Sequence, residues 1–204
     1  MTIALCGLSA LFSLAYLFLF AARADKPLAG AVVKTLPVAL LALAGWLGGA
    51  PALIWGGLAF GALGDFLLAR EGEPAFLAGM GAFAAGHLAY ALAFGPGLPA
   101  PLAAAPFVAL ALSTEVWLAP HTGALKWPVR GYALIICVMA AMATLRPTPL
   151  LVSGAALFVA SDLLLAVQMF RARGTLARVL PWLVWPCYWL GQALILAAFL
   201  PAAP

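Results

Sequence analysis

The stretches GDFLLA at residues 64–69 and SDLLLA at residues 161–166 each place one aspartate inside a long apolar run. Each run is about 20 residues long, which is the length of an α-helix that crosses the hydrocarbon core of a bilayer. A charged side chain at that depth costs roughly 2.5–3.5 kcal/mol on insertion scales. Two such acids in similar surroundings, Asp65 and Asp162, therefore predict a functional site within a membrane protein.

The composition of the chain is that of a protein whose solvent is lipid. Hydrophobic residues make up 67% of the 204 residues, charged residues make up 8%, and the mean hydropathy is +1.14. Soluble domains carry about 25% charged residues, so the composition excludes a soluble domain. The net charge of +4 does not indicate a nucleic-acid partner, because the basic residues lie mostly at the ends of apolar segments.

Charged residues and Pro/Gly clusters divide the chain into apolar segments that are each long enough to span a bilayer. Eight helices are predicted, over residues 2–22, 28–47, 51–69, 74–94, 101–119, 127–145, 149–170 and 180–200. The connections are short, so consecutive helices should lie antiparallel in a compact bundle. The predicted fold class is an all-α integral membrane protein with one membrane domain over residues 1–204. The first segment is longer than a signal-peptide core and no basic residue precedes it, so we interpret it as a retained helix.

Lysines and arginines set the expected orientation. The first, third, fifth and seventh connections, with the helix ends beside them, hold Arg23, Lys26, Arg70, Lys126, Arg130, Arg171, Arg173 and Arg178, whereas the opposite side holds only Arg146. The positive-inside rule places the basic connections in the cytoplasm and both termini outside. We expect the location to be the inner (plasma) membrane of a bacterium.

The positions of the charged residues suggest an internal repeat. Asp65 and Asp162 are 97 residues apart on the third and seventh predicted helices, and Lys34 and Arg130 are 96 apart on the second and sixth. A four-helix unit used twice in the same orientation would produce this spacing. The alternative is a chance alignment of leucine-rich helices.

Most of the strongly polar groups within the predicted helices lie in the half nearer the cytoplasm, although consecutive helices alternate in direction. At the helical rise of about 1.5 Å per residue, Asp65 lies about 8 Å and Asp162 about 13 Å from the cytoplasmic end of its helix. Lys34 lies at about 10 Å, Glu115 at about 8 Å and Arg130 at about 5 Å, while His87 and Gln192 are deeper, at about 18–20 Å. The clustering predicts a polar cavity that opens toward the cytoplasmic leaflet.

Several of these residues also have a purely structural interpretation. Under it, Lys34 extends its ammonium to the membrane interface, and Glu115 and Arg130 are interfacial charges. His87 would occupy a hydrogen-bonded core position with Tyr90. Tyr188 and Gln192 would hold neighbouring helices together. A structural role is least favoured for the two aspartates, because a neutral side chain would pack there at lower cost.

Two buried carboxyls suit acid–base chemistry. Burial disfavours the charged form, and a neighbouring carboxyl or cation separates such a pair into one acid and one base. This arrangement cleaves ethers and acetals through oxocarbenium-like states, and we expect no metal and no organic cofactor. The sequence holds only two histidines, His87 and His121, and no GxSxG motif, which argues against zinc and serine hydrolases. Cys6, Cys137 and Cys187 show no metal-binding or disulfide spacing.

Short motifs follow one another in a fixed order from residue 26 onward. They are Lys26-Pro27-Leu28, Gly64-Asp65-x-x-Leu68, Gly81-Ala82-Phe83, His87-x-x-Tyr90, Lys126-x-Pro128-Val129 with Tyr132, Leu157-Phe158-x-x-Ser161-Asp162-x-x-Leu165-Ala166 and Tyr188-x-x-x-Gln192. Together they resemble the YhhN-type lysoplasmalogenase family of membrane proteins. The resemblance implies eight membrane helices and hydrolysis of the vinyl ether bond of lysoplasmalogens, which yields a fatty aldehyde and glycerophosphoethanolamine or glycerophosphocholine.

The resemblance also implies roles for individual residues. Asp65 and Asp162 correspond to the acid/base pair. Lys26, Lys34, His87, Tyr90 and Tyr132 correspond to lining or head-group contacts. The other candidate substrate-binding residues, singled out by their positions in the predicted helices, are Glu115, Arg130, Tyr188 and Gln192. The expected partners are a single-chain lipid substrate and the bilayer, with no nucleic acid. One alternative is a small proton- or cation-coupled transporter that uses the same acids, and a third hypothesis is a structural membrane scaffold.

Overall fold

The structure is a computed structural model that describes residues 1–23, 25 and 27–201. These residues form helices and contain no strand. The long helices are α1 (Thr2–Leu19), α2 (Leu28–Leu47), α3 (Ala52–Leu68), α4 (Glu73–Phe94), α5 (Pro101–Trp117), α6 (Lys126–Ala143), α7 (Pro149–Phe170) and α9 (Pro181–Phe199). Within or beside the predicted connections, short helical turns occur at η1 (Ala119–His121), η2 (Gly123–Leu125) and α8 (Gly174–Val179).

The lengths and compositions of the helices match those of membrane spans. Seven helical segments of the described chain are long and apolar enough to cross a membrane, and α3 is a shorter apolar helix. Prolines occupy the first turn of α5, α7 and α9, where the missing N–H group costs no hydrogen bond. The predicted all-helical class is confirmed, and the helices are consistent with an integral membrane protein.

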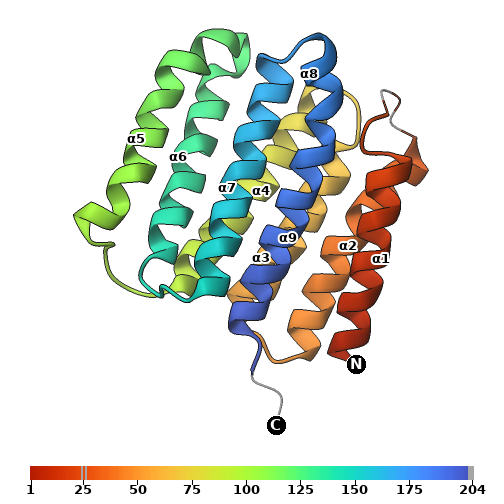
Figure 1. Ribbon diagram of the computed structural model, residues 1–204, viewed down its shortest axis with the longest axis vertical. Coiled ribbons are helices and arrows are strands. Elements are labelled where there is room, and N and C mark those ends of the chain that lie inside the picture. Colours follow the sequence, from red (N-terminus) through yellow and green to blue (C-terminus); the bar gives the residue numbers. More distant parts are fainter. Residues whose placement is uncertain (24, 26, 202–204) are drawn as a thin grey trace.

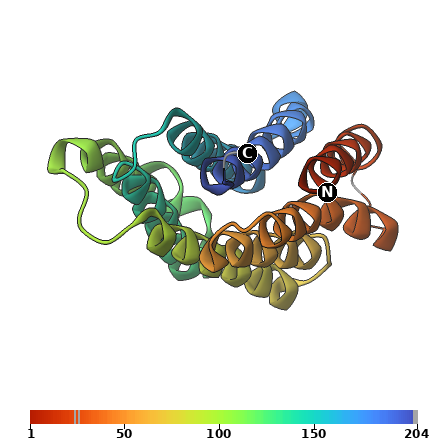
Figure 2. The same ribbon diagram turned by 90° about the horizontal axis from the view of Figure 1, so that it is seen from below.

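Six long helices contact one another in a closed ring, in the order α2, α3, α4, α6, α7 and α9, with α9 returning to α2. Figure 2 looks along the helices and shows α7 and α9 on the concave side of a curved row formed by the other ring helices. Outside the ring, α1 packs on α2 and α9, and α5 packs mainly on α6. We call these six the ring helices, and α1 and α5 the outer helices.

The charges are distributed unequally between the two ends of the molecule. The connections that follow α1, α3, α5 and α7 lie at one end, opposite Met1 and the last turn of α9 (Figure 1). We call this the basic end, because it carries Arg23, Arg70, Lys126, Arg171, Arg173 and Arg178. Arg146, in the connection after α6, lies at the opposite end.

Helices α7 and α9 approach each other closely at two glycines. A Cβ added at Gly154 would lie 2.9 Å from the backbone nitrogen of Ile195, and one at Gly191 would lie 3.0 Å from the carbonyl oxygen of Gly154. Small residues of this kind let helix backbones approach each other in membranes. The pair therefore fixes α7, which carries Asp162, against α9, which carries Tyr188.

We expect Gly191→Ala to lower the stability of the protein by about 1–3 kcal/mol, because the added methyl group meets backbone atoms that cannot move aside. Gly56→Ala is the matched control, since a Cβ there meets nothing within 4 Å, and it should leave stability unchanged or slightly raised. Thermal unfolding of both purified variants in the same detergent measures the difference. Equal midpoints would contradict the close approach of α7 and α9.

Candidate active site

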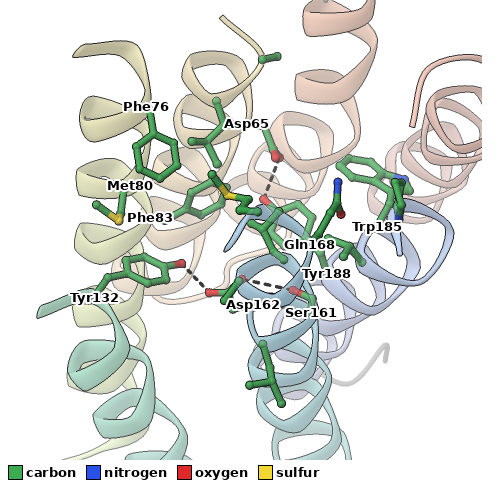
Figure 3. A pocket seen from close by; sticks show the side chains of 18 of the residues that line it. Asp65, Phe76, Met80, Phe83, Tyr132, Ser161, Asp162, Gln168, Trp185 and Tyr188 are labelled. Carbon is green, nitrogen blue, oxygen red and sulfur yellow. Dashed lines mark hydrogen bonds between the residues drawn. The ribbon is translucent and has the colours of Figure 1, made fainter. Parts of the chain in front are cut away.

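A cavity of about 380 Å³ extends inward from the basic end. Arg23, Asp25 and Trp117 line it near that end, and Asp65 and Asp162 line it further inside (Figure 3). Most of the remaining wall is apolar, with side chains such as Phe76, Met80, Phe83, Leu110, Ile136, Val159 and Val184. A few polar groups that converge within apolar walls are typical of a binding site for a small molecule or a lipid.

Asp65, on α3, is buried and contacted from two neighbouring helices. The ammonium of Lys34 on α2 lies 3.4 Å from Oδ1, and the hydroxyl of Tyr188 on α9 donates to Oδ2 at 2.8 Å. The Tyr188 oxygen in turn accepts from Nε2 of Gln192 at 3.4 Å, and the Gln192 carbonyl accepts from the hydroxyl of Tyr90. A series of donors thus leads from Tyr90 through Gln192 and Tyr188 to the carboxylate of Asp65.

Asp162, on α7, receives a comparable set of contacts. The hydroxyl of Tyr132 on α6 donates to Oδ2 at 2.6 Å, and Ser161 donates to Oδ1 at 3.3 Å. His87 on α4 places Nε2 at 3.0 Å from the Tyr132 oxygen and 3.6 Å from Oδ2. Its Nδ1 is buried and finds no hydrogen-bond partner among the described residues. Because a buried N–H is rarely left unpaired, we assign the hydrogen to Nε2, so that His87 donates to Tyr132 and Tyr132 donates to Asp162.

The two carboxyl groups differ in their charged neighbours and in exposure. Within the described part of the chain, Lys34 is the cation that pairs with Asp65, whereas no lysine or arginine lies within 4.0 Å of Asp162. The side chain of Asp65 is 2% exposed and that of Asp162 is 14% exposed. The site therefore contains one enclosed carboxylate with an ammonium partner and one carboxyl that is more open to the cavity.

A model of the YhhN family matches residues 29–199, from the first turn of α2 to the last residue of α9. The chain belongs to the YhhN family. The match confirms the family that the sequence motifs indicated, and it spans all residues of both carboxyl networks. Neither the curated proteins nor the solved structures contain a match to the chain.

Six of the candidate binding residues of this YhhN protein belong to the two networks: Lys34, His87, Tyr90, Tyr132, Tyr188 and Gln192. Of these, Lys34, Tyr132 and Tyr188 line the cavity, and the other three support them from behind. Glu115 and Arg130 are brought together instead, with Arg130 Nε donating to Glu115 Oε1 at 2.8 Å, and neither is among the residues that line the cavity. Lys26 lies outside the described residues.

Sequence reasoning missed two charged residues that line the cavity. Arg23 donates to both carboxylate oxygens of Asp25, at 2.8 and 2.7 Å, and these hydrogen bonds hold the pKa of Asp25 below its usual range. Their signal in the sequence was an opposite-charge pair next to a membrane helix at the basic end. No group of three or more His, Cys, Asp or Glu side chains that could hold a metal ion occurs among the described residues.

Lys34→Met should destabilise the protein, because it leaves the Asp65 carboxylate buried without its cation. Removing one partner of a buried ion pair costs about 3–5 kcal/mol, whereas replacing both with neutral groups is often nearly neutral. The double variant Lys34→Met/Asp65→Asn should therefore recover most of the stability. Thermal unfolding of the single and double variants in detergent tests this. If the double variant were as unstable as Lys34→Met, Lys34 would contribute by packing rather than by charge.

Proposed function

We propose that this YhhN family protein is a membrane-embedded hydrolase that cleaves the vinyl ether bond of a lysoplasmalogen, a phospholipid with a single hydrocarbon chain. The products would be a fatty aldehyde and glycerophosphoethanolamine or glycerophosphocholine. The proposal depends on one observation: two carboxyl groups in different charge environments line the same largely apolar cavity. The apolar wall suits a hydrocarbon chain, and a carboxyl pair suits cleavage through an oxocarbenium-like state.

The contacts favour Asp162 as the acid and Asp65 as the base. The ammonium of Lys34 at 3.4 Å stabilises the charged form of Asp65. Asp162 has no such cation among the described residues and faces the cavity, so it can carry a proton on one oxygen while Oδ2 accepts from Tyr132. Two carboxyls with separated charge states are the arrangement that general acid–base catalysis uses.

The reaction then needs only water and the two carboxyls. Asp162 transfers its proton to the vinyl carbon remote from the ether oxygen, so the π electrons form a C–H bond and the other vinyl carbon becomes part of an oxocarbenium ion. The Asp65 carboxylate stabilises this cation. As the oxygen of a water molecule bonds to the oxocarbenium carbon, Asp65 takes a proton from that water. When the hemiacetal collapses, its hydroxyl proton returns to Asp162 and the leaving oxygen takes the proton from Asp65. Aldehyde and alcohol are released, and both carboxyls regain their starting states.

The proposed setting is the inner membrane of a bacterium, with the basic end in the cytoplasm and both termini outside. The distribution of lysine and arginine supports this orientation. In this setting, the cavity would face the cytoplasmic leaflet, and the phosphate of the lipid would be near basic groups that line the cavity, such as Arg23 and Lys34.

We also propose that the chain contains two copies of a four-helix unit, α1–α4 and α5–α9. The carboxyl networks support a duplication, because each acid is contacted by the preceding helix of its own unit and by the last helix of the other. Asp65 on α3 is contacted from α2 and α9, and Asp162 on α7 from α6 and α4.

We expect Asp65→Asn and Asp162→Asn each to lower aldehyde release from a lysoplasmalogen by at least ~10²-fold, the usual contribution of a positioned acid or base. Glu71→Gln, which changes an exposed acid in the connection after α3, is the matched control and should keep full activity. Mass spectrometry of products from purified, monodisperse proteins measures the effect. Activity in both asparagine variants would contradict the proposal, and Asp65-dependent uptake into proteoliposomes without product would favour transport.

Hydrolysis in D₂O should place one deuterium on the aldehyde carbon next to the carbonyl, because Asp162 exchanges its proton with solvent and delivers it to that carbon. The aldehyde is trapped as it forms and analysed by mass spectrometry. The authentic aldehyde incubated with the Asp162→Asn protein corrects for spontaneous exchange. An aldehyde no richer in deuterium than this control would contradict protonation at carbon.

A further inference from the structure

A second hollow lies between the outer helix α5 and the ring helix α6, with a volume of about 190 Å³. Its wall consists entirely of apolar side chains, among them Phe107 and Ala111 from α5 and Cys137 and Ala141 from α6. Figure 1 shows α5 at the edge of the molecule, beside α6. The hollow contains no group that could take part in the proposed reaction, so its chemistry suits only a hydrocarbon.

This hollow lies next to the cavity that contains the two acids. Cys137 lines both, and the cavity wall also includes Leu110 from α5 and Ile136 from α6. Tyr132, which contacts Asp162, marks the level of the acids on α6. At the helical rise, Cys137 lies about 8 Å and Ala141 about 14 Å further from the basic end. A chain that started at the acids and followed α6 past Cys137 would therefore reach the hollow in the direction of the membrane interior.

The two outer helices are held differently. Trp189 donates to Ser9 Oγ at 2.9 Å and Trp185 donates to Ser13 Oγ at 3.0 Å, so the middle of α1 is joined to α9. Ser9 also donates to the carbonyl oxygen of Pro37 on α2 at 2.7 Å.

For α5, the polar contacts to other elements recorded in the described chain lie near the basic end. Glu115 accepts from Arg130, and the carbonyl oxygen of Trp117 accepts from Arg171 at 2.7 Å. Thr114 is the one buried residue of α5. The seam between α5 and α6 is thus held by apolar contacts along residues 107–112, where a hydrocarbon chain can replace them at little cost.

We propose that the seam between α5 and α6 holds the hydrocarbon chain of the substrate. The acids then act on the bond nearest the head group, and the small side chains of Ala111 and Ala141 leave room for the far end of the chain. This inference rests on the proposed function for the identity of the lipid. The binding site itself is tested without catalysis.

A lysoplasmalogen that carries a diazirine near the end of its chain provides the direct test. After photolysis with the full-length protein in detergent, peptide mapping should find adducts within residues 107–112 or 134–141. Excess unlabelled lysoplasmalogen should remove them. Adducts mainly on α1 or α9 would overturn the proposal. So would adducts that an unrelated two-chain phospholipid removes equally well, because bulk lipid would then fill the seam.

Ala111→Phe tests the same site by function. The larger side chain should lower kcat/KM for a long-chain substrate by on the order of tenfold relative to a short-chain one, since apolar contact is lost for several methylene groups. Ala109→Phe adds the same bulk to the same helix at an exposed position that lines neither hollow, and it should leave the chain-length profile unchanged.

The outcomes separate the two proposals. Specific labelling of the seam without hydrolysis by the wild-type protein would contradict the proposed reaction and support the chain site. The opposite result is hydrolysis in which Ala111→Phe and Ala109→Phe show equal chain-length profiles and the label reacts elsewhere. It would overturn the chain site and leave the proposed reaction intact. If Ala111→Phe does not fold, the labelling of the wild-type protein decides.

Discussion

The placement of one buried and one partly buried carboxyl group among apolar helices is the constraint on which the arrangement of the ring helices depends. Each carboxyl needs donors that its own helix cannot supply, so Asp65 is contacted from α2 and α9 and Asp162 from α4 and α6. Every ring helix therefore carries either an acid or a group that contacts one. The outer helices contribute none of these contacts. Losing the packing of one ring helix would leave a buried carboxyl without its donors, at a cost of several kcal/mol.

One difference between the two halves of the site bears directly on charge. The helix before each acid contributes Lys34 in the first half and Tyr132 in the second. An ammonium compensates a full negative charge, whereas a phenol hydroxyl donates one hydrogen bond and also tolerates a protonated carboxyl. Under the proposed function, this difference would let the two acids hold different charge states, which is the requirement of acid–base catalysis. The greater exposure of Asp162 to the cavity adds to the difference.

The sequence predicted the spans and the two acids because lipid imposes strong rules on length and on charge. It could not predict which helices meet, since short connections determine only the neighbours along the chain. The contact of α4 with α6 and the return of α9 to α2 depend on packing at positions such as Gly191. The spacing of the suggested repeat predicted that Arg130 would take the place at Asp162 that Lys34 takes at Asp65. In the structure, Tyr132 contacts Asp162 instead. Two residues correspond to about 200° around a helix, so Arg130 points away and pairs with Glu115.

The position of the acids would suit the proposed substrate, a lipid with one chain. The reacting bond of such a lipid lies just below its head group, so a head group at the basic end would bring that bond to the depth of Asp65 and Asp162. The proposed hydrolysis also needs water, and the hollow beyond the acids is lined by apolar side chains. Under the proposal, water would enter from the basic end, through the same opening as the head group. A bound lipid would fill this opening, and the water that remains beside Asp65 and Asp162 would be the water that reacts.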